Sequence, residues 1–109
     1  MSGMTDREKL DPGDPRYPPR LREGKKKEKD WPPTLFCRGN LELLASDRLV
    51  AIVGSRHPSG EAERATRELA HERAGSGWLT VSGFAAGIDR AAFRGALAHP
   101  RGRTMAVLA

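Results

Sequence analysis

Two short loops rich in glycine contain the residue types that suit the binding of a phosphate. The first loop spans residues 54–60 (GSRHPSG) and the second spans residues 82–89 (SGFAAGID). In the first loop, Gly54 permits a tight turn and Ser59 is placed to cap the helix that follows. Arg56 adds a forked guanidinium that matches the geometry of a phosphate. Since backbone amides at helix starts also attract anions, the two loops together predict a composite anion pocket.

Each loop taken singly also has a purely structural interpretation. Glycines that follow strands often serve only the geometry of the turn, and Asp89 in the first turn of a helix favours the helix dipole without any ligand. Neither loop has the G-x-G-x-x-G spacing of dinucleotide-dependent enzymes, which disfavours a classical dehydrogenase. The sequence shows no general base, nucleophile or metal-binding cluster. We therefore expect no catalytic residue, no metal and no cofactor.

The two loops must be held by an α/β framework. The apolar run at 49–53 is typical of a strand buried on both faces, and we expect it at the centre of a parallel sheet. Further strands are predicted at 78–81 and 104–108, and helices at 62–70 and 88–96 separate them. The small residues of the second helix are expected to pack very close to the sheet. The order β-α-β-α-β is one half of a Rossmann-like three-layer fold with right-handed crossovers, so the fold and its site are expected to be truncated.

The amino-terminal part has a different character. Residues 1–30 combine prolines with a lysine run, which predicts an extended or disordered basic arm. Seven basic and two acidic residues lie between Arg16 and Lys29, an excess equal to the net charge of +5. Such a run binds a phosphate backbone or is only a solvated loop, and the sequence leaves both open. Residues 31–109 are expected to form the α/β domain, with 31–48 packed on it as an edge element.

The composition indicates one small soluble domain. The 109 residues are 38% hydrophobic and 30% charged, and the longest apolar run falls well short of the roughly 20 residues of a membrane-spanning helix. The polar amino terminus is unlike a secretory signal, so we expect a cytoplasmic protein without a membrane partner. Cys37, the single cysteine, is expected to be a reduced, half-buried thiol. His71 and His99 are expected to be far apart and receive no role.

Several stretches resemble the DNA-processing protein A (Smf) family. VAIVGSR, then VSGFAAGIDRAA, GAL and TMAVLA carry the resemblance, preceded by DPRYPPRL and PPTLFCRGN, so it covers roughly residues 10–109. It implies a Rossmann-like domain that binds single-stranded DNA and helps to load a RecA-type recombinase during natural transformation. It also implies a possible homodimer of the full-length protein. The candidate DNA- or phosphate-binding residues are Gly54, Ser55, Arg56, Ser59, Ser82, Gly83, Gly87 and Asp89.

The sequence departs from the family pattern at several places and leaves other functions open. The family usually has an aromatic residue and a glycine shortly after the serine of the first loop, whereas residues 59–62 (SGEA) follow here, and Phe93 stands where a histidine usually follows GID. The lysine run at 25–29 resembles an insertion relative to the usual spacing. One alternative is a nucleotide-binding enzyme similar to the cytokinin-activating phosphoribohydrolases, whose P-G-G-x-G-T-x-x-E motif is absent from this chain. Another is an inactive fragment. For Arg56, a contact with phosphate competes with an ion pair to Asp89 across the pocket.

Overall fold

The computed structural model describes residues 7–23 and 32–108 of the chain. The chain divides into two compact units, Met1–Ser46 and Asp47–Ala109. The division therefore falls after residue 46, whereas the sequence placed it after residue 30. The lysine run lies outside the described residues.

The first unit is built on a two-stranded antiparallel pair. Strand β1 (Glu8–Leu10) pairs with strand β2 (Leu35–Cys37), and Leu10 lies opposite Leu35. A single helical turn, α1 (Pro19–Arg22), follows β1, and its start suits proline because the fixed φ of that residue is already helical. The 3-10 helix η2 (Leu41–Ala45) is capped by the Asn40 side chain, which accepts a hydrogen bond from the amide of Glu42.

Residues 7–23 were predicted to form an extended arm, but the structure contains a strand and a helical turn there. Two large side chains explain the difference, because Leu10 and Tyr17 are almost fully buried. The Tyr17 hydroxyl donates a hydrogen bond of 2.6 Å to the carbonyl oxygen of Pro33. The expected edge element also differs, since the hydrogen-bonded neighbour of β2 is β1 rather than a strand of the parallel sheet.

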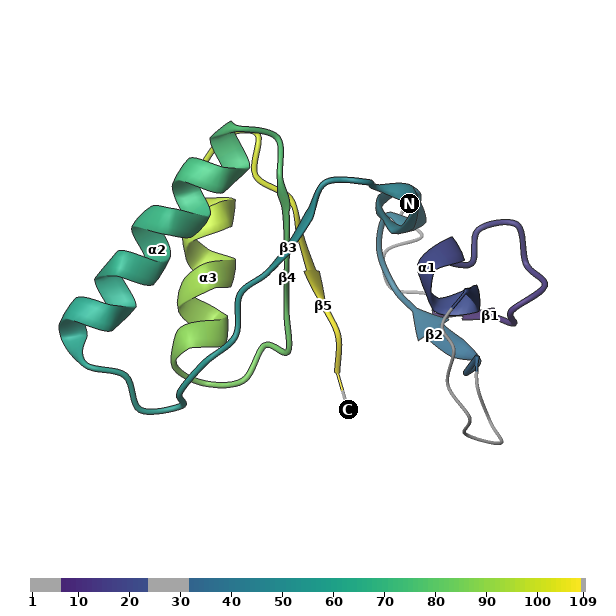
Figure 1. Cartoon of the computed structure of the whole chain (residues 1–109), viewed down its shortest axis with the longest axis horizontal. Coiled ribbons are helices and arrows are strands. Elements are labelled where there is room, and N and C mark those ends of the chain that lie inside the picture. The colour runs from purple at the N-terminus through teal and green to yellow at the C-terminus, as the bar shows by residue number, and fades with distance from the viewer. Residues whose placement is uncertain (1–6, 24–31, 109) are drawn as a thin grey trace. The chain divides into compact units, whose positions relative to one another are not determined.

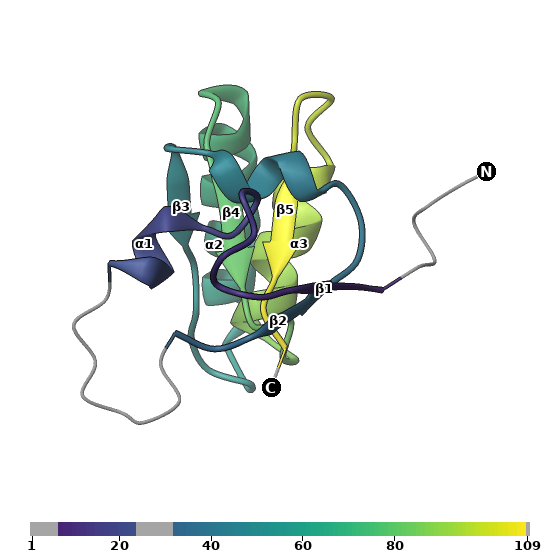
Figure 2. The same ribbon diagram turned by 90° about the vertical axis from the view of Figure 1, so that its right-hand side faces the viewer.

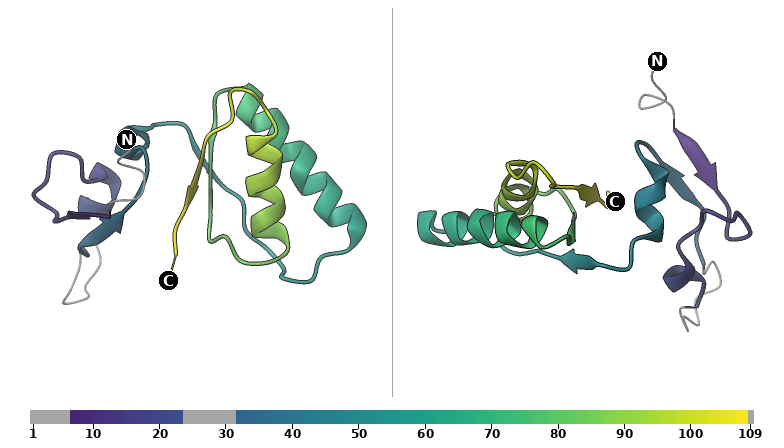
Figure 3. Two further views of the ribbon diagram at one scale, coloured as in Figure 1. Left: turned by 180° about the vertical axis from the view of Figure 1, so that it is seen from behind. Right: turned by 90° about the horizontal axis from the view of Figure 1, so that it is seen from above.

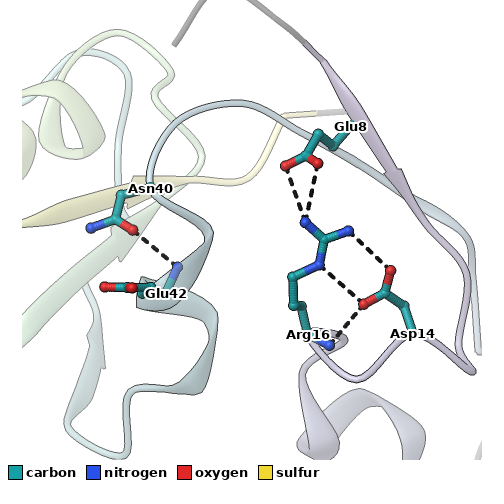
Figure 4. A network of polar contacts seen from close by, with 5 residues as sticks. All are labelled: Glu8, Asp14, Arg16, Asn40 and Glu42. Carbon is teal, nitrogen blue, oxygen red and sulfur yellow. Dashed lines mark hydrogen bonds and ion pairs between the residues drawn. The ribbon is translucent and has the colours of Figure 1, made fainter. Parts of the chain in front are cut away.

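Two arginines counted in the basic run form ion pairs or hydrogen bonds within this unit. Arg16 forms ion pairs of 3.1 Å with both Glu8 and Asp14, as Figure 4 shows. Hydrogen bonds from Arg16 hold the pKa of the Asp14 carboxyl below its usual value. Arg22 donates to the carbonyl oxygens of Asp14 and Tyr17. These two cations therefore stabilise the first unit.

The second unit has the predicted β-α-β-α-β order. Its elements are β3 (Leu49–Ala51), α2 (Gly60–Gly75), β4 (Leu79–Ser82), α3 (Ile88–Leu97) and β5 (Thr104–Ala106). The three strands are parallel, and the two helices lie on one face of the sheet (Figure 1). The predicted α/β fold with a parallel sheet is confirmed.

The strand order corrects the expected place of the first strand. The order is β3-β4-β5, so β4 is central and β3 lies at an edge of the described sheet, as Figure 2 shows. Val53, at the end of the apolar run, is 68% exposed, whereas Leu79 in β4 is buried. An apolar run identifies a strand, but the successive crossovers decide which strand comes to the middle.

The small residues of α3 pack mainly against α2. The core between the two helices consists of Ala70, Ala74, Ala92 and Ala96, with Ile52 packed against it. A Cβ atom on Gly95 would overlap the backbone carbonyl of Arg67 in α2. The close contact predicted for this face is present, but its partner is the neighbouring helix.

Candidate functional site

The two glycine loops leave the carboxyl ends of neighbouring parallel strands and meet there. The first loop follows β3, the second follows β4, and both lie at the same end of the sheet in Figures 1 and 3. The amide of Ile88 donates a hydrogen bond of 3.0 Å to the carbonyl oxygen of Ser55. Gly87 has a φ of +86°, and a Cβ atom there would overlap the backbone of Ser55 and Arg56. Glycine is therefore required at residue 87 for the loops to touch.

Asp89 ties the two loops together with both oxygens of its carboxylate. Oδ1 accepts a hydrogen bond of 3.2 Å from the amide of Gly54, and Oδ2 accepts one of 3.1 Å from the amide of Gly83. The side chain is buried, with 6% of the residue exposed. Both carboxylate oxygens accept hydrogen bonds from backbone amides, and hydrogen bonds to a carboxylate are a strong type. The competing ion pair with Arg56 is not formed within the described part of the chain.

The serines of the two loops also contribute to their local structure. Ser55 Oγ accepts from the amide of His57 at 3.0 Å, and Ser59 Oγ accepts from the amide of Ala62 at 3.1 Å. Ser59 is thus the N-cap of α2, as predicted. Ser82 is buried at the end of β4, and its carbonyl oxygen accepts from the amide of Val107.

Arg56 is exposed where the two loops meet. Among residues 7–23 and 32–108, no ion pair or hydrogen bond engages its guanidinium. The backbone amides of Ser55 and Arg56 likewise donate to no acceptor within those residues. The helix α2 begins four residues later, so its positive end lies on the same loop. A cation, two backbone donors and a helix start therefore lie on one short loop.

Phe84, in the second loop, is a residue that no pattern in the sequence singles out. It has a φ of +57°, a left-handed conformation that is rare for a bulky residue. Its ring packs edge to face against Phe93, with 4.8 Å between ring centroids. The guanidinium carbon of Arg90 lies 5.1 Å from the centroid of the Phe84 ring. A positive φ and a tertiary ring contact leave no signal in a single sequence.

The cysteine and the two histidines considered in the sequence analysis lie in ordinary packing environments. Cys37 is half-buried as predicted, and burial raises the pKa of its thiol. His71 and His99, which were expected to be far apart, instead pack edge to face with ring centroids 4.9 Å apart, because α2 and α3 lie side by side. No helix in the described ranges is long and apolar enough to cross a membrane.

A short parallel sheet with helices on one face and two glycine loops at its carboxyl edge defines a Rossmann-like domain. Comparison with known proteins identifies its family. The sequence model of the DNA recombination-mediator protein A family matches residues 9–109, and the chain belongs to that family. This confirms the resemblance to the DNA-processing protein A (Smf) proteins.

Individual relatives cover most of this chain. The DNA processing protein DprA of Bacillus subtilis is 36% identical over 80 residues, which make up 73% of this chain and 27% of that protein. Protein Smf of Synechocystis is 40% identical over 102 residues, or 91% of this chain and 24% of that protein. The chain thus spans about a quarter of the length of these relatives.

Solved structures of two family members share the fold. DprA of Streptococcus pneumoniae matches with a TM-score of 0.77 and 33% identity, covering 97% of this chain and 35% of that one. DNA processing protein A of Helicobacter pylori matches with a TM-score of 0.70 and 31% identity, covering 94% and 42% of the two chains. The Helicobacter pylori protein binds single-stranded DNA.

Proposed function

We propose that this chain binds single-stranded DNA and that Arg56 holds a phosphate of the strand. The observation that carries the proposal is the exposed Arg56 guanidinium at the junction of two loops that are fixed to each other. The Helicobacter pylori relative binds single-stranded DNA, which supports the same ligand here.

The roles within the site follow from the contacts. Arg56 gives a bidentate, charge-assisted contact to a phosphate, and the amides of Ser55 and Arg56 supply further donors. Gly54, Gly83 and Gly87 allow the loops to approach, and the serines fix their turns. Asp89 positions the loops and does not contact the phosphate, because the negative charge of its carboxylate would repel that of the phosphate. We thus divide the predicted site into the residues that bind the phosphate, Arg56 and the backbone of Ser55, and the residues that support them.

We further propose that the chain is a binding module and not an enzyme. A general base needs a carboxylate or imidazole free to take a proton. The buried carboxylate at the site, Asp89, instead accepts hydrogen bonds from two amides. These two hydrogen bonds favour a structural role of Asp89 over acid–base catalysis.

The wider role rests on family membership. We propose that the protein acts in natural transformation and DNA recombination, delivers single strands to a RecA-type recombinase, and forms a homodimer. The family's name as a recombination mediator supports the recombinase as partner.

Fluorescence anisotropy with a labelled oligo-dT tests the proposal. The chain should bind the oligonucleotide, bind a duplex of equal length more weakly, and lose affinity as salt rises, because phosphate contacts release counterions. In a parallel assay with adenosine monophosphate, no free adenine should appear. Absence of oligo-dT binding by the folded chain would overturn the proposal, and release of adenine would favour the enzyme.

A further inference from the structure

The Phe84 side chain has an unusual position for a large aromatic residue. It is 37% exposed and lies on a loop rather than in the core between α2 and α3. Its φ of +57° is one that glycine or asparagine adopts more easily. Backbone conformations of this kind occur preferentially where a site requires them. Core packing alone therefore does not account for a phenylalanine here.

The surroundings of Phe84 orient its ring and add a cation. Phe93, from the second turn of α3, contacts the ring edge to face, and interplanar angles near 68° are a favoured geometry for such pairs. Arg90, one turn earlier on the same helix, places its guanidinium over the ring. An oriented aromatic ring beside a planar cation is the kind of surface on which nucleobases stack.

The ring belongs to the loop that touches Arg56. Gly87, three residues after Phe84, packs against the backbone of Ser55 and Arg56, and Asp89 fixes the start of both loops. Arg56 and Phe84 therefore lie on two loops whose backbones are held against each other.

We propose that Phe84, together with Arg90, stacks a base of single-stranded DNA beside the phosphate held by Arg56. This rests on the proposed function and adds to it the group that contacts the base. The stack has no sequence preference, because every base presents a π-face. It selects single strands, whose bases are free to leave the helical stack.

The decisive comparison uses two ligands, an oligo-dT and an abasic oligonucleotide of equal length. Phe84→Asn keeps a residue that tolerates the left-handed conformation but removes the ring. It should weaken oligo-dT binding by roughly 5- to 150-fold, the range measured for loss of one stacked base. It should leave binding of the abasic ligand unchanged. Phe84→Trp, which retains a π-face, should bind oligo-dT within about threefold of the original chain.

A matched control comes from the first unit, where Phe36 is 60% exposed and Arg7 lies over its ring at 5.0 Å. Phe36→Ala removes the same kind of aromatic and cation pair and should leave binding unchanged. The inference is overturned if Phe84→Asn leaves oligo-dT affinity unchanged, if it weakens both ligands equally, or if Phe36→Ala weakens oligo-dT binding as strongly.

The phosphate role gives a different pattern. Arg56→Ala should weaken binding of both ligands, because both have the phosphate backbone. If Arg56→Ala has that effect while Phe84→Asn has none, the proposed function stands and the stacking role fails. If the original chain binds neither ligand, the proposed function fails and the stacking role fails with it.

Discussion

Asp89 is the residue that makes one site out of two loops. Its carboxylate joins the amides of Gly54 and Gly83, which are 35 and 6 residues away in the chain. The loops then present Arg56 from a fixed backbone. An arginine on an unrestrained loop would have to lose more conformational freedom on binding.

Replacing Asp89 with alanine should destabilise the second unit by roughly 1.5–3 kcal/mol, because two backbone donors lose a charged partner. Urea unfolding followed by circular dichroism measures this free energy of unfolding. Glu68→Ala, at an exposed position of α2, is the matched control and should change the free energy by less than about 0.5 kcal/mol. Equal stabilities of the Asp89 variant and the original chain would contradict the positioning role.

The sequence indicates which residues belong to the site better than it indicates what each of them does. The capping role of Ser59 could be assigned because a serine directly before a helix has a defined local geometry, whereas the phosphate role of Arg56 stays a prediction. The roles of Asp89 and Phe84 depend on partners brought together by the fold. A carboxylate in a first helical turn looks the same in sequence whether it serves a dipole or links two loops.

At the scale of the elements, the close packing of α2 on α3 sets the distance between the two loops. The core between them is made of alanines, and Gly95 contacts the backbone of Arg67. Because each helix begins at the end of one loop, the separation of the helices fixes the separation of the loops.

Gly95→Ala should therefore destabilise the second unit by about 1–3 kcal/mol, since the added methyl group meets backbone atoms. Gly60→Ala offers a control in the other helix, because a Cβ atom at Gly60 has no neighbour within 4 Å. That control should be neutral or stabilising by up to about 1 kcal/mol. Thermal melts of both variants test the contrast, and a Gly95 variant as stable as the Gly60 variant would refute it.

The existence and order of the elements in the second unit could be predicted, but not their neighbours. Periodicity locates the strands at 49–53, 78–81 and 104–108 to within about two residues of β3, β4 and β5. It does not show that the middle strand in sequence is also the middle strand of the sheet. It also placed the small face of α3 against the sheet, because residue size indicates a close contact without naming the partner.

At the scale of the whole molecule, the first unit is what the sequence predicts least well. Its strands β1 and β2 are separated by 24 residues between Leu10 and Leu35 and have only three residues each. Pairing at that separation depends on tertiary contacts, including the buried Tyr17, rather than on local propensity. A proline-rich, charged segment consequently resembles a disordered arm.

The first unit should lose stability in alkali because burial raises the pKa of the Tyr17 hydroxyl, although nearby Arg22 opposes the rise. The stabilising contribution is complete below the ordinary tyrosine pKa of about 10 and is lost as pH rises through the higher pKa of the folded state. Tyr17 is the single tyrosine, so ultraviolet absorbance titration reports it alone. The midpoint should lie above that of the urea-unfolded chain, and identical midpoints would contradict this.

The central claim is that Arg56 holds a phosphate of single-stranded DNA, and oligo-dT affinity of three variants measured by fluorescence anisotropy tests it most directly. Arg56→Ala should weaken binding roughly 10- to 100-fold, as expected for a charge-assisted contact of about 1.5–3 kcal/mol. Arg56→Lys should recover only part, because an ammonium cannot reproduce the guanidinium fork. Arg64→Ala, which removes the same charge from an exposed position of α2, should change affinity by less than about threefold. A folded Arg56→Ala chain that binds oligo-dT as tightly as the Arg64→Ala chain would contradict the claim.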